Sequence, residues 1–135
     1  NGKMEKATQL LGHPYTVNGT IVLGKQLGRT LGFPTINIIP DIVKVLPPKG
    51  VYITKLWLLN KEYYGLTNIG YNPTVNGKTK TVETYIFDFT EDVYGKEVNI
   101  EFLDYIRPEI KFKSLEELVR QMHKDKEVAI KYLEL

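Results

Sequence analysis

The stretch GKQLGRTLGFPTIN at residues 24–37 combines glycines and cations with two oxygen donors, Thr35 and Asn37. Glycines let backbone amides approach an anion closely, and the guanidinium of Arg29 adds a fixed positive charge. Thr35 and Asn37 are two residues apart, so on a strand both side chains point the same way. A hydroxyl and an amide oxygen suit Mg²⁺, which takes its other ligands from water and phosphates. The stretch therefore predicts a phosphate and Mg²⁺ site or, alternatively, a barrel corner whose glycines serve sharp bends.

The same stretch departs from the Walker A phosphate loop, GxxxxGK[ST], which leads directly into a helix. Its spacing is one residue shorter, and Arg29 stands where that pattern has lysine. Pro34 restricts the preceding Phe33 to extended geometry, so a helix cannot begin there. The loop is therefore expected to lead into a strand.

Glu83 lies in the segment TVETYIFDF, which has the composition of a strand. Strict alternation would place Glu83 on one face with Tyr85, Phe87 and Phe89. A carboxylate among aromatic side chains is costly unless it has a partner or a task, and a general base that accepts a proton from an alcohol is such a task. The alternative is that this face is the solvent side of an edge strand.

The segment YIRPEIKFKSLEEL offers a cation and an aromatic ring, Arg107 and Phe112, just before a helical pattern. Together they could hold a planar aromatic ligand. The alternative is a loop that pins the terminal helix to the barrel, with Phe112 filling the core.

Six short runs of β-branched and aromatic residues are expected to form strands. Asn60-Lys61, Asn76-Gly77 and Tyr94-Gly95 have the chemistry of tight turns, which favours antiparallel neighbours. The prediction is a mainly β fold, a small closed six-stranded antiparallel barrel. The expected strands are 15–23, 35–39, 50–59, 62–70, 81–89 and 97–106.

Two helices are expected beside these strands. Residues 5–11 have good helix formers and end at Gly12. Ser114 and Glu117 have capping-box spacing and open a long helix with one apolar stripe, which is expected to close the barrel.

Composition limits the class of protein. A chain of 135 residues with 42% apolar residues suits one domain and contains no run long enough to cross a bilayer. It has no cysteine, which fits a reducing cytoplasm, and its net charge of +2 is small for a protein that binds nucleic acid.

Six motifs in order give the chain a resemblance to riboflavin kinase: GRTLGFPTIN, GVYITKL, NIGYNPTV, VETYIFDF, DVYGKEVNIEF and IRPEIKFKSLEEL. It is most similar to the kinase module at the C-terminal end of bacterial bifunctional riboflavin kinase/FAD synthetases. The resemblance implies a six-stranded Greek-key barrel with a C-terminal helix at 15–135, preceded by a short helix or linker at 1–14. The first residues resemble the segment that follows the adenylyltransferase domain in the bifunctional enzymes, and the sequence leaves open whether such a domain precedes the module in the natural chain.

The implied reaction is transfer of the γ-phosphoryl group of ATP to the ribityl 5′-hydroxyl of riboflavin, giving FMN and ADP with Mg²⁺ as cofactor. A barrel that binds nucleic acid, or an interaction barrel without catalysis, is the alternative. Two positions depart from the family pattern: Tyr85 stands where many relatives have histidine, and Ile110 where some eukaryotic relatives have a basic residue. By resemblance, the catalytic base is Glu83, the Mg²⁺ ligands are Thr35 and Asn37, the ATP contacts are Gly24, Arg29, Thr35, Asn37, Ile86, Asp88 and Tyr94, and the flavin contacts are Arg107 and Phe112.

Overall fold

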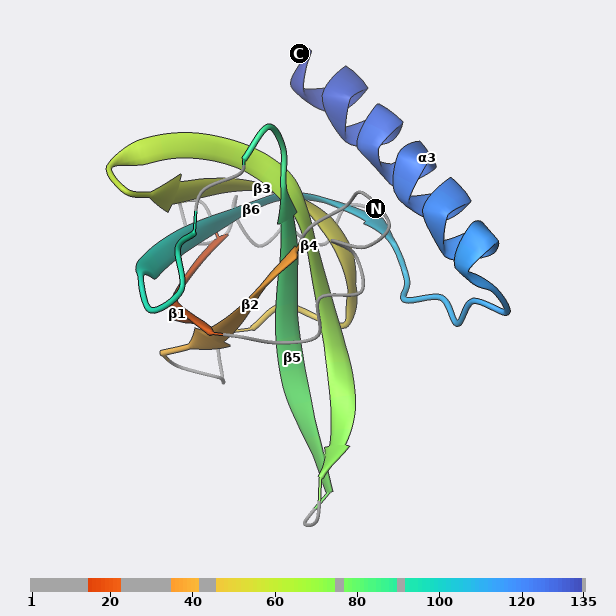
Figure 1. The fold of residues 1–135 in the computed structure, drawn as a ribbon, viewed down its shortest axis with the longest axis horizontal. Coiled ribbons are helices and arrows are strands. Elements are labelled where there is room, and N and C mark those ends of the chain that lie inside the picture. The colour runs from red at the N-terminus through yellow and green to blue at the C-terminus, as the bar shows by residue number, and fades with distance from the viewer. Residues whose placement is uncertain (1–14, 23–34, 42–45, 75–76, 90–91, 135) are drawn as a thin grey trace.

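The computed structural model describes residues 15–22, 35–41, 46–74, 77–89 and 92–134. This part of the chain consists of six strands and one long helix (Figure 1). Their bounds are β1 Tyr15–Val22, β2 Thr35–Pro40, β3 Gly50–Leu58, β4 Lys61–Thr74, β5 Gly77–Ile86, β6 Glu97–Arg107 and α3 Leu115–Leu133. No helix within these ranges is long and apolar enough to cross a membrane.

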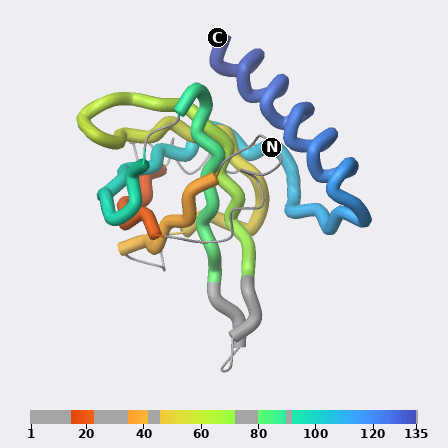
Figure 2. Tube along the Cα trace, in the orientation of Figure 1, coloured from red at the N-terminus to blue at the C-terminus, as the bar shows by residue number. Residues whose placement is uncertain are grey.

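The strands form a closed barrel in the order β1-β2-β5-β4-β3-β6, and every pair is antiparallel. Closure comes from β1, which pairs with β2 on one side and β6 on the other; the trace shows the last strand returning beside the first (Figure 2). Strands β3, β4 and β5 are consecutive neighbours, and β6 returns to lie beside β3, which is a Greek-key arrangement. The predicted six-stranded antiparallel barrel is therefore confirmed.

Two separate apolar clusters hold the barrel and its helix. The interior cluster includes Tyr52, Leu56, Ile69 and Ile100, which alternate along their strands with outward-facing residues. The second cluster lies on the outer wall, where Val51, Ile53, Leu66, Tyr85 and Phe87 meet apolar side chains of α3. Because both faces of these strands are apolar, the outer face needs a cover.

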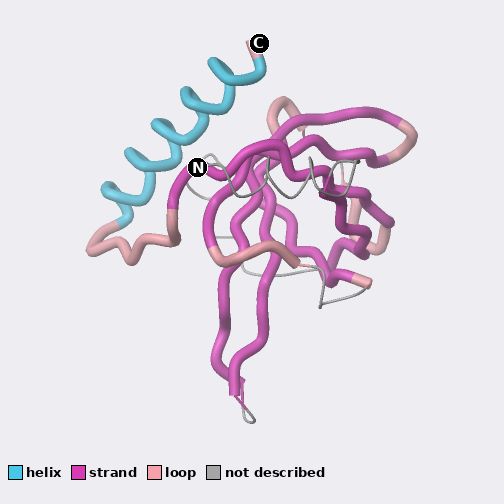
Figure 3. Tube along the Cα trace, turned by 180° about the vertical axis from the view of Figure 1, so that it is seen from behind, coloured by secondary structure: helices cyan, strands magenta, loops and turns pink. Residues whose placement is uncertain are grey.

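The helix α3 supplies that cover. It begins after Ser114, whose Oγ accepts a hydrogen bond from Glu117 N at 3.2 Å, so the predicted helix start is confirmed. It lies beside the barrel wall in both opposite views (Figures 1 and 3). The expectation that the helix closes the barrel is wrong, because the strands close it and the helix packs outside.

The tight turn between β3 and β4 consists of Leu59 and Asn60, which have φ of 54° and 63°. Two positive φ values are typical of a type I′ hairpin, so the hairpin predicted at Asn60-Lys61 occurs one residue earlier. Beyond this turn β4 and β5 form a long antiparallel ladder that extends past the other strands (Figure 1). The predicted helix at 5–11 and the Asn76 of the Asn76-Gly77 turn lie outside the described residues.

The end of β5 corrects one predicted face. The strand stops at Ile86, and Asp88 has a φ of 54°, so the alternation does not continue to Phe89. Phe89 instead packs on the interior cluster, edge to face with Tyr63 at 4.9 Å between ring centroids. Glu83 therefore shares its face with Tyr85 but not with Phe89.

Tyr52 is the largest fully buried side chain of the interior, with 1% of its surface exposed. Its ring lies edge to face with Phe102 and Tyr105, at 5.2 and 5.3 Å between centroids. Its hydroxyl donates a hydrogen bond to Pro48 O. Burial raises the pKa of Tyr52 to about 12, with smaller contributions from Tyr105 and Tyr15.

The raised pKa of Tyr52 predicts that the protein loses stability at alkaline pH. A tyrosine in the unfolded chain ionises near pH 10, whereas Tyr52 in the folded protein stays protonated until about pH 12. The contribution of Tyr52 to the free energy of unfolding is complete below pH 10. It is lost as the pH rises to 12, by about 1.4 kcal/mol per pH unit. In urea titrations over this range, the free energy of unfolding of Tyr52→Phe should fall less steeply than that of the wild type. Equal slopes would contradict this.

Candidate active site

A row of polar residues crosses three neighbouring strands. Asn37 on β2 is the register partner of Glu83 on β5, and Glu83 is the register partner of Asn68 on β4. Directly opposed residues of antiparallel strands share a face, with Cβ atoms about 4.5–5.5 Å apart. The face is the outer one, because Tyr85, two residues from Glu83, belongs to the cluster beneath α3. The pairing therefore brings a carboxylate and two amides together outside the barrel.

A cavity of about 230 Å³ lies between this outer wall and the helix with the loop that precedes it. Small-molecule sites usually begin at about 300 Å³, so the cavity is somewhat smaller than a usual site. Apolar side chains and a few polar groups line it, which is the usual character of such sites. The lining residues are Thr35, Val51, Leu66, Asn68, Glu83, Tyr85, Arg107, Glu109, Ile110, Phe112, Leu118, Met122 and Asp125.

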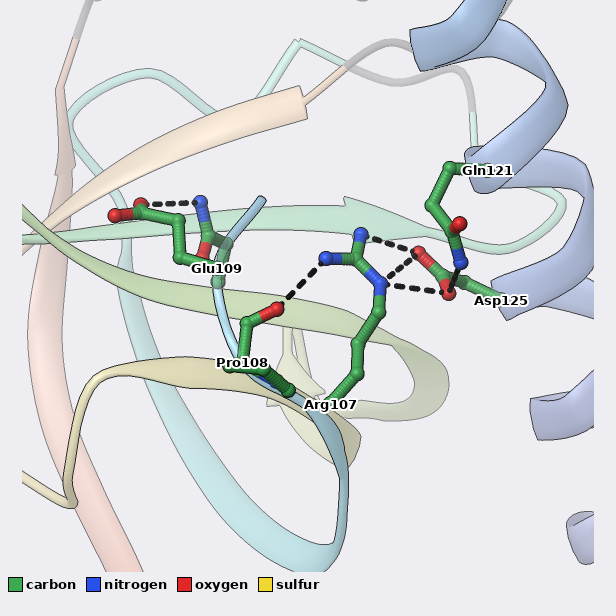
Figure 4. Close-up of polar contacts among 6 residues, drawn as sticks. Arg107, Pro108, Glu109, Gln121 and Asp125 are labelled. Carbon is green, nitrogen blue, oxygen red and sulfur yellow. Dashed lines mark hydrogen bonds and ion pairs between the residues drawn. The ribbon is translucent and has the colours of Figure 1, made fainter. Parts of the chain in front are cut away.

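A buried ion pair between Arg107 and Asp125 joins the end of β6 to α3 (Figure 4). Arg107 Nη2 donates to Asp125 Oδ2 at 2.7 Å, and Arg107 Nε lies 3.0 and 3.1 Å from the two carboxylate oxygens. Arg107 Nη1 donates to Pro108 O, and Gln121 Nε2 donates to Asp125 Oδ1 at 2.9 Å. Three guanidinium nitrogens are thus fixed, while Nη1 and Nη2 each keep a second N–H for another acceptor.

Sequence reasoning missed Asp125, although the sequence contains a signal for it. Leu118, Met122, Asp125 and Ala129 recur at helical spacing along one stripe, so Asp125 is a carboxylate on an apolar face. Its side chain is only 4% exposed, and such a residue needs a charged partner. That the partner is Arg107 follows only from the packing of α3 against the barrel.

Lys126 makes a second connection between α3 and the wall. Its Nζ donates to the Tyr85 hydroxyl at 3.3 Å and lies 5.8 Å from the Tyr85 ring centroid and 5.9 Å from that of Phe87. Tyr85 and Phe87 are themselves edge to face at 5.4 Å. Tyr85 and Phe87 therefore support the helix, and Tyr85 also lines the cavity.

Glu109 connects the loop before α3 to the polar row. It accepts a hydrogen bond from Asn68 Nδ2 at 3.4 Å on one oxygen, and it pairs with Lys49 Nζ at 3.4 Å on the other. Asn68 Oδ1 is buried, and no described residue donates to it. Neither Asn68 nor Glu109 had been singled out from the sequence.

The residues expected to form the site fall into three groups. Thr35, Glu83, Arg107 and Phe112 line one cavity, although they come from three strands and a loop. Asn37 is the register partner of Glu83 but is not among the residues that line the cavity. The remaining predicted contacts are Ile86, whose side chain packs in the barrel interior, Asp88 and Tyr94, which are exposed, and Gly24 and Arg29, which lie outside the described residues.

The donor set of this site fits Mg²⁺ held mainly by substrate phosphates. No group of three or more His, Cys, Asp or Glu side chains suited to a metal occurs within the described ranges. Thr35 and Asn37 offer two neutral oxygens on one face of β2, and Mg²⁺ commonly takes only one or two protein ligands beside phosphate. The arrangement is therefore compatible with Mg·nucleotide.

Comparison with known proteins identifies the family. Residues 11–133 match the family model Flavokinase, described as riboflavin kinase. The bifunctional riboflavin kinase/FMN adenylyltransferase of Bacillus subtilis (strain 168) is 42% identical over 135 residues, which are 98% of this chain and 43% of that protein. The chain belongs to the riboflavin kinase family, and it spans less than half the length of this relative.

Two solved structures share the fold. The riboflavin kinase from Trypanosoma brucei has a TM-score of 0.65 at 28% identity, covering 90% of this chain and 80% of its own. A protein of Streptococcus pneumoniae described as a macrolide-efflux protein has a TM-score of 0.89 at 36% identity, covering 96% of this chain and 42% of its own. The name of the second protein differs from those of the other relatives, although part of its chain shares the fold of this one.

The Arg107–Asp125 pair gives a stability prediction. Asp125→Ala leaves Arg107, which is 16% exposed, without its carboxylate, so the free energy of unfolding should fall by about 3–5 kcal/mol. The matched control is Lys49→Gln, which breaks the more exposed Lys49–Glu109 pair and should change it by about 0–1 kcal/mol. Urea unfolding followed by circular dichroism measures both. Similar losses in the two variants would mean that the buried pair has no special role.

Proposed function

We propose that this chain transfers the γ-phosphoryl group of ATP to the ribityl 5′-hydroxyl of riboflavin, giving FMN and ADP. The observation that carries the proposal is the position of Glu83, which lines a cavity of suitable character together with Thr35. Membership of the riboflavin kinase family supports the same reaction. The relatives named as bifunctional enzymes support the further proposal that the module works next to an adenylyltransferase domain.

Glu83 acts in this proposal as the general base. Its carboxylate accepts the proton of the attacking hydroxyl, and the oxygen then bonds to the γ-phosphorus as the bond to ADP breaks. Thr35 and Asn37 lie one strand away and would hold Mg²⁺ with the nucleotide phosphates. The bound Mg²⁺ supplies neutralisation of the negative charge on the transferring group. The residues of β2 and β5 thus position both substrates side by side.

The apolar part of the cavity is the proposed flavin site. Val51 and Leu66 form its wall, and Phe112 comes from the loop before α3. A planar ring system buries large apolar area against such side chains. The two remaining N–H groups of Arg107 are suitable donors for ring carbonyl oxygens, because Asp125 holds the guanidinium in one orientation.

Glu83→Gln tests the base directly. The amide keeps the shape of the side chain but cannot take up the proton, so turnover of riboflavin with Mg·ATP should fall by about 10²-fold or more. Riboflavin affinity, measured by quenching of flavin fluorescence, should change little. The control is Glu101→Gln, a glutamate of β6 that does not line the cavity. Near-normal turnover in Glu83→Gln would remove Glu83 from the mechanism, and an inactive wild type would overturn the proposed function.

Asn37→Ala tests the nucleotide side of the site. Loss of the amide oxygen should weaken binding of Mg·ATP by at least about 10-fold, while the fold survives because one strand amide contributes little to a core. Calorimetric titration with Mg·ATP and circular dichroism are measured on the same sample. Asn99→Ala is the control, since Asn99 is a strand asparagine bonded to Asn18 away from the cavity. Loss of the folded signal together with binding would favour a structural role for Asn37.

A further inference from the structure

Asn68 Oδ1 is a buried acceptor whose hydrogen-bonding capacity is unused by the described residues. A buried polar atom left without a partner is destabilising, so it is uncommon in folded proteins unless water, a ligand or a function explains it. Asn68 lines the cavity, so a molecule bound there can reach its side chain. The atom therefore indicates a contact that is completed by substrate.

The orientation of the Asn68 amide is determined by its neighbour Glu109. The carboxylate of Glu109 can only accept hydrogen bonds, and it lies 3.4 Å from Asn68 Nδ2. Turning the amide over would set its oxygen against the carboxylate and lose this bond. The oxygen is therefore the atom of the amide that has no partner among the described residues, and its partner must be an O–H or N–H donor.

The position of Asn68 restricts which donor this is. Asn68 is the direct register partner of Glu83, and both side chains line the cavity. If Glu83 is the base, the reacting hydroxyl lies within about 2.6–3.2 Å of its carboxylate. The groups next to Asn68 are then those adjacent to the reacting hydroxyl on the same substrate chain.

We propose that Asn68 Oδ1 accepts a hydrogen bond from a secondary hydroxyl of the polyol chain of the substrate. This contact selects polyol-bearing flavins and orients the terminal hydroxyl toward Glu83. The inference rests on the proposed function, since it assumes that Glu83 faces the reacting alcohol. Asn68 is a specificity-determining residue that touches substrate and has no part in the proton transfer itself.

Such a contact discriminates between flavins because the cost of leaving the buried oxygen unpaired exceeds the gain from one ordinary hydrogen bond. A substrate with the hydroxyl satisfies the buried oxygen, whereas an analogue without it leaves the oxygen desolvated and unpaired. Sites that hydrogen-bond a substrate hydroxyl reject the analogue that lacks it more strongly than an apolar pocket rejects a size change. One neutral contact of this kind should favour the polyol by about 10-fold.

The test compares riboflavin with an isoalloxazine that carries a 5-hydroxypentyl chain at N10. This analogue keeps the ring and the terminal hydroxyl but has no secondary hydroxyls. The wild type should prefer riboflavin in kcat/KM by about 10-fold or more, and Asn68→Ala should reduce that preference by about 10-fold by losing activity on riboflavin alone. The matched control Asn99→Ala should keep the wild-type preference. An unchanged preference in Asn68→Ala would overturn the inference.

Folding of the variant is followed separately. Asn68→Ala removes an unpaired buried oxygen but also the 3.4 Å hydrogen bond to Glu109, so its unfolding temperature without flavin should stay close to that of the wild type. If the alanine variant fails to fold, Asn68→Leu, which has a similar shape and no acceptor, is used for the same comparison. A preference for riboflavin that survives in the leucine variant overturns the inference equally.

Binding of the two flavins, measured by fluorescence quenching, separates this inference from the proposed function. A wild type that binds riboflavin about 10-fold more tightly than the hydroxypentyl analogue, with the difference lost in Asn68→Ala, supports the contact even if no phosphorylation occurs. That result would overturn the proposed reaction alone. Equal affinities of the wild type for both flavins would overturn the role of Asn68 even if riboflavin is phosphorylated.

Discussion

The position of β5 between β2 and β4 is the constraint on which the rest of the site depends. The same register places Val82 and Ile86 in the barrel interior and Glu83 on the outer wall. A shift of one residue would exchange these faces, burying the carboxylate and exposing the apolar side chains. The hydrophobic interior therefore fixes the direction of Glu83 without any contribution from the site itself. Asn37 and Asn68 are set by the same pairing, because each is opposed to Glu83.

The outer wall and α3 form a second layer whose packing is incomplete, because a cavity lies between them. Ala129 and its apolar neighbours cover the wall at one part of the helix, while Glu83 and Asn68 of the polar row line a cavity. The Arg107–Asp125 pair lies between these parts and lines the cavity. Apolar residues of the same volume are often at least as stabilising as a buried ion pair. The pair instead gives Arg107 a defined orientation.

The unpaired oxygen of Asn68 resembles that ion pair in one respect. Both are polar groups in a place where apolar packing would be more favourable for the free protein. A substrate that supplied the missing partner of the Asn68 oxygen would recover this free energy only when its groups are correctly placed. In the proposed role of Asn68, stability is exchanged for selectivity, and the closed barrel, with its large interior cluster, tolerates the loss.

The sequence by itself determined the six strands, the antiparallel pairing of β3 with β4 and the start of α3 at Ser114, because alternation and capping are local properties. The turn at Tyr94-Gly95 was expected to join antiparallel neighbours, but β5 and β6 are not adjacent in the barrel. It also pointed to Thr35 and Glu83 through their chemical types. Only the tertiary structure decided that α3 lies outside the barrel and that Asp125 meets Arg107. It alone revealed the unpaired oxygen of Asn68, since that depends on which strands are neighbours. Barrel closure joins residues far apart in the chain, and no local pattern encodes those distances.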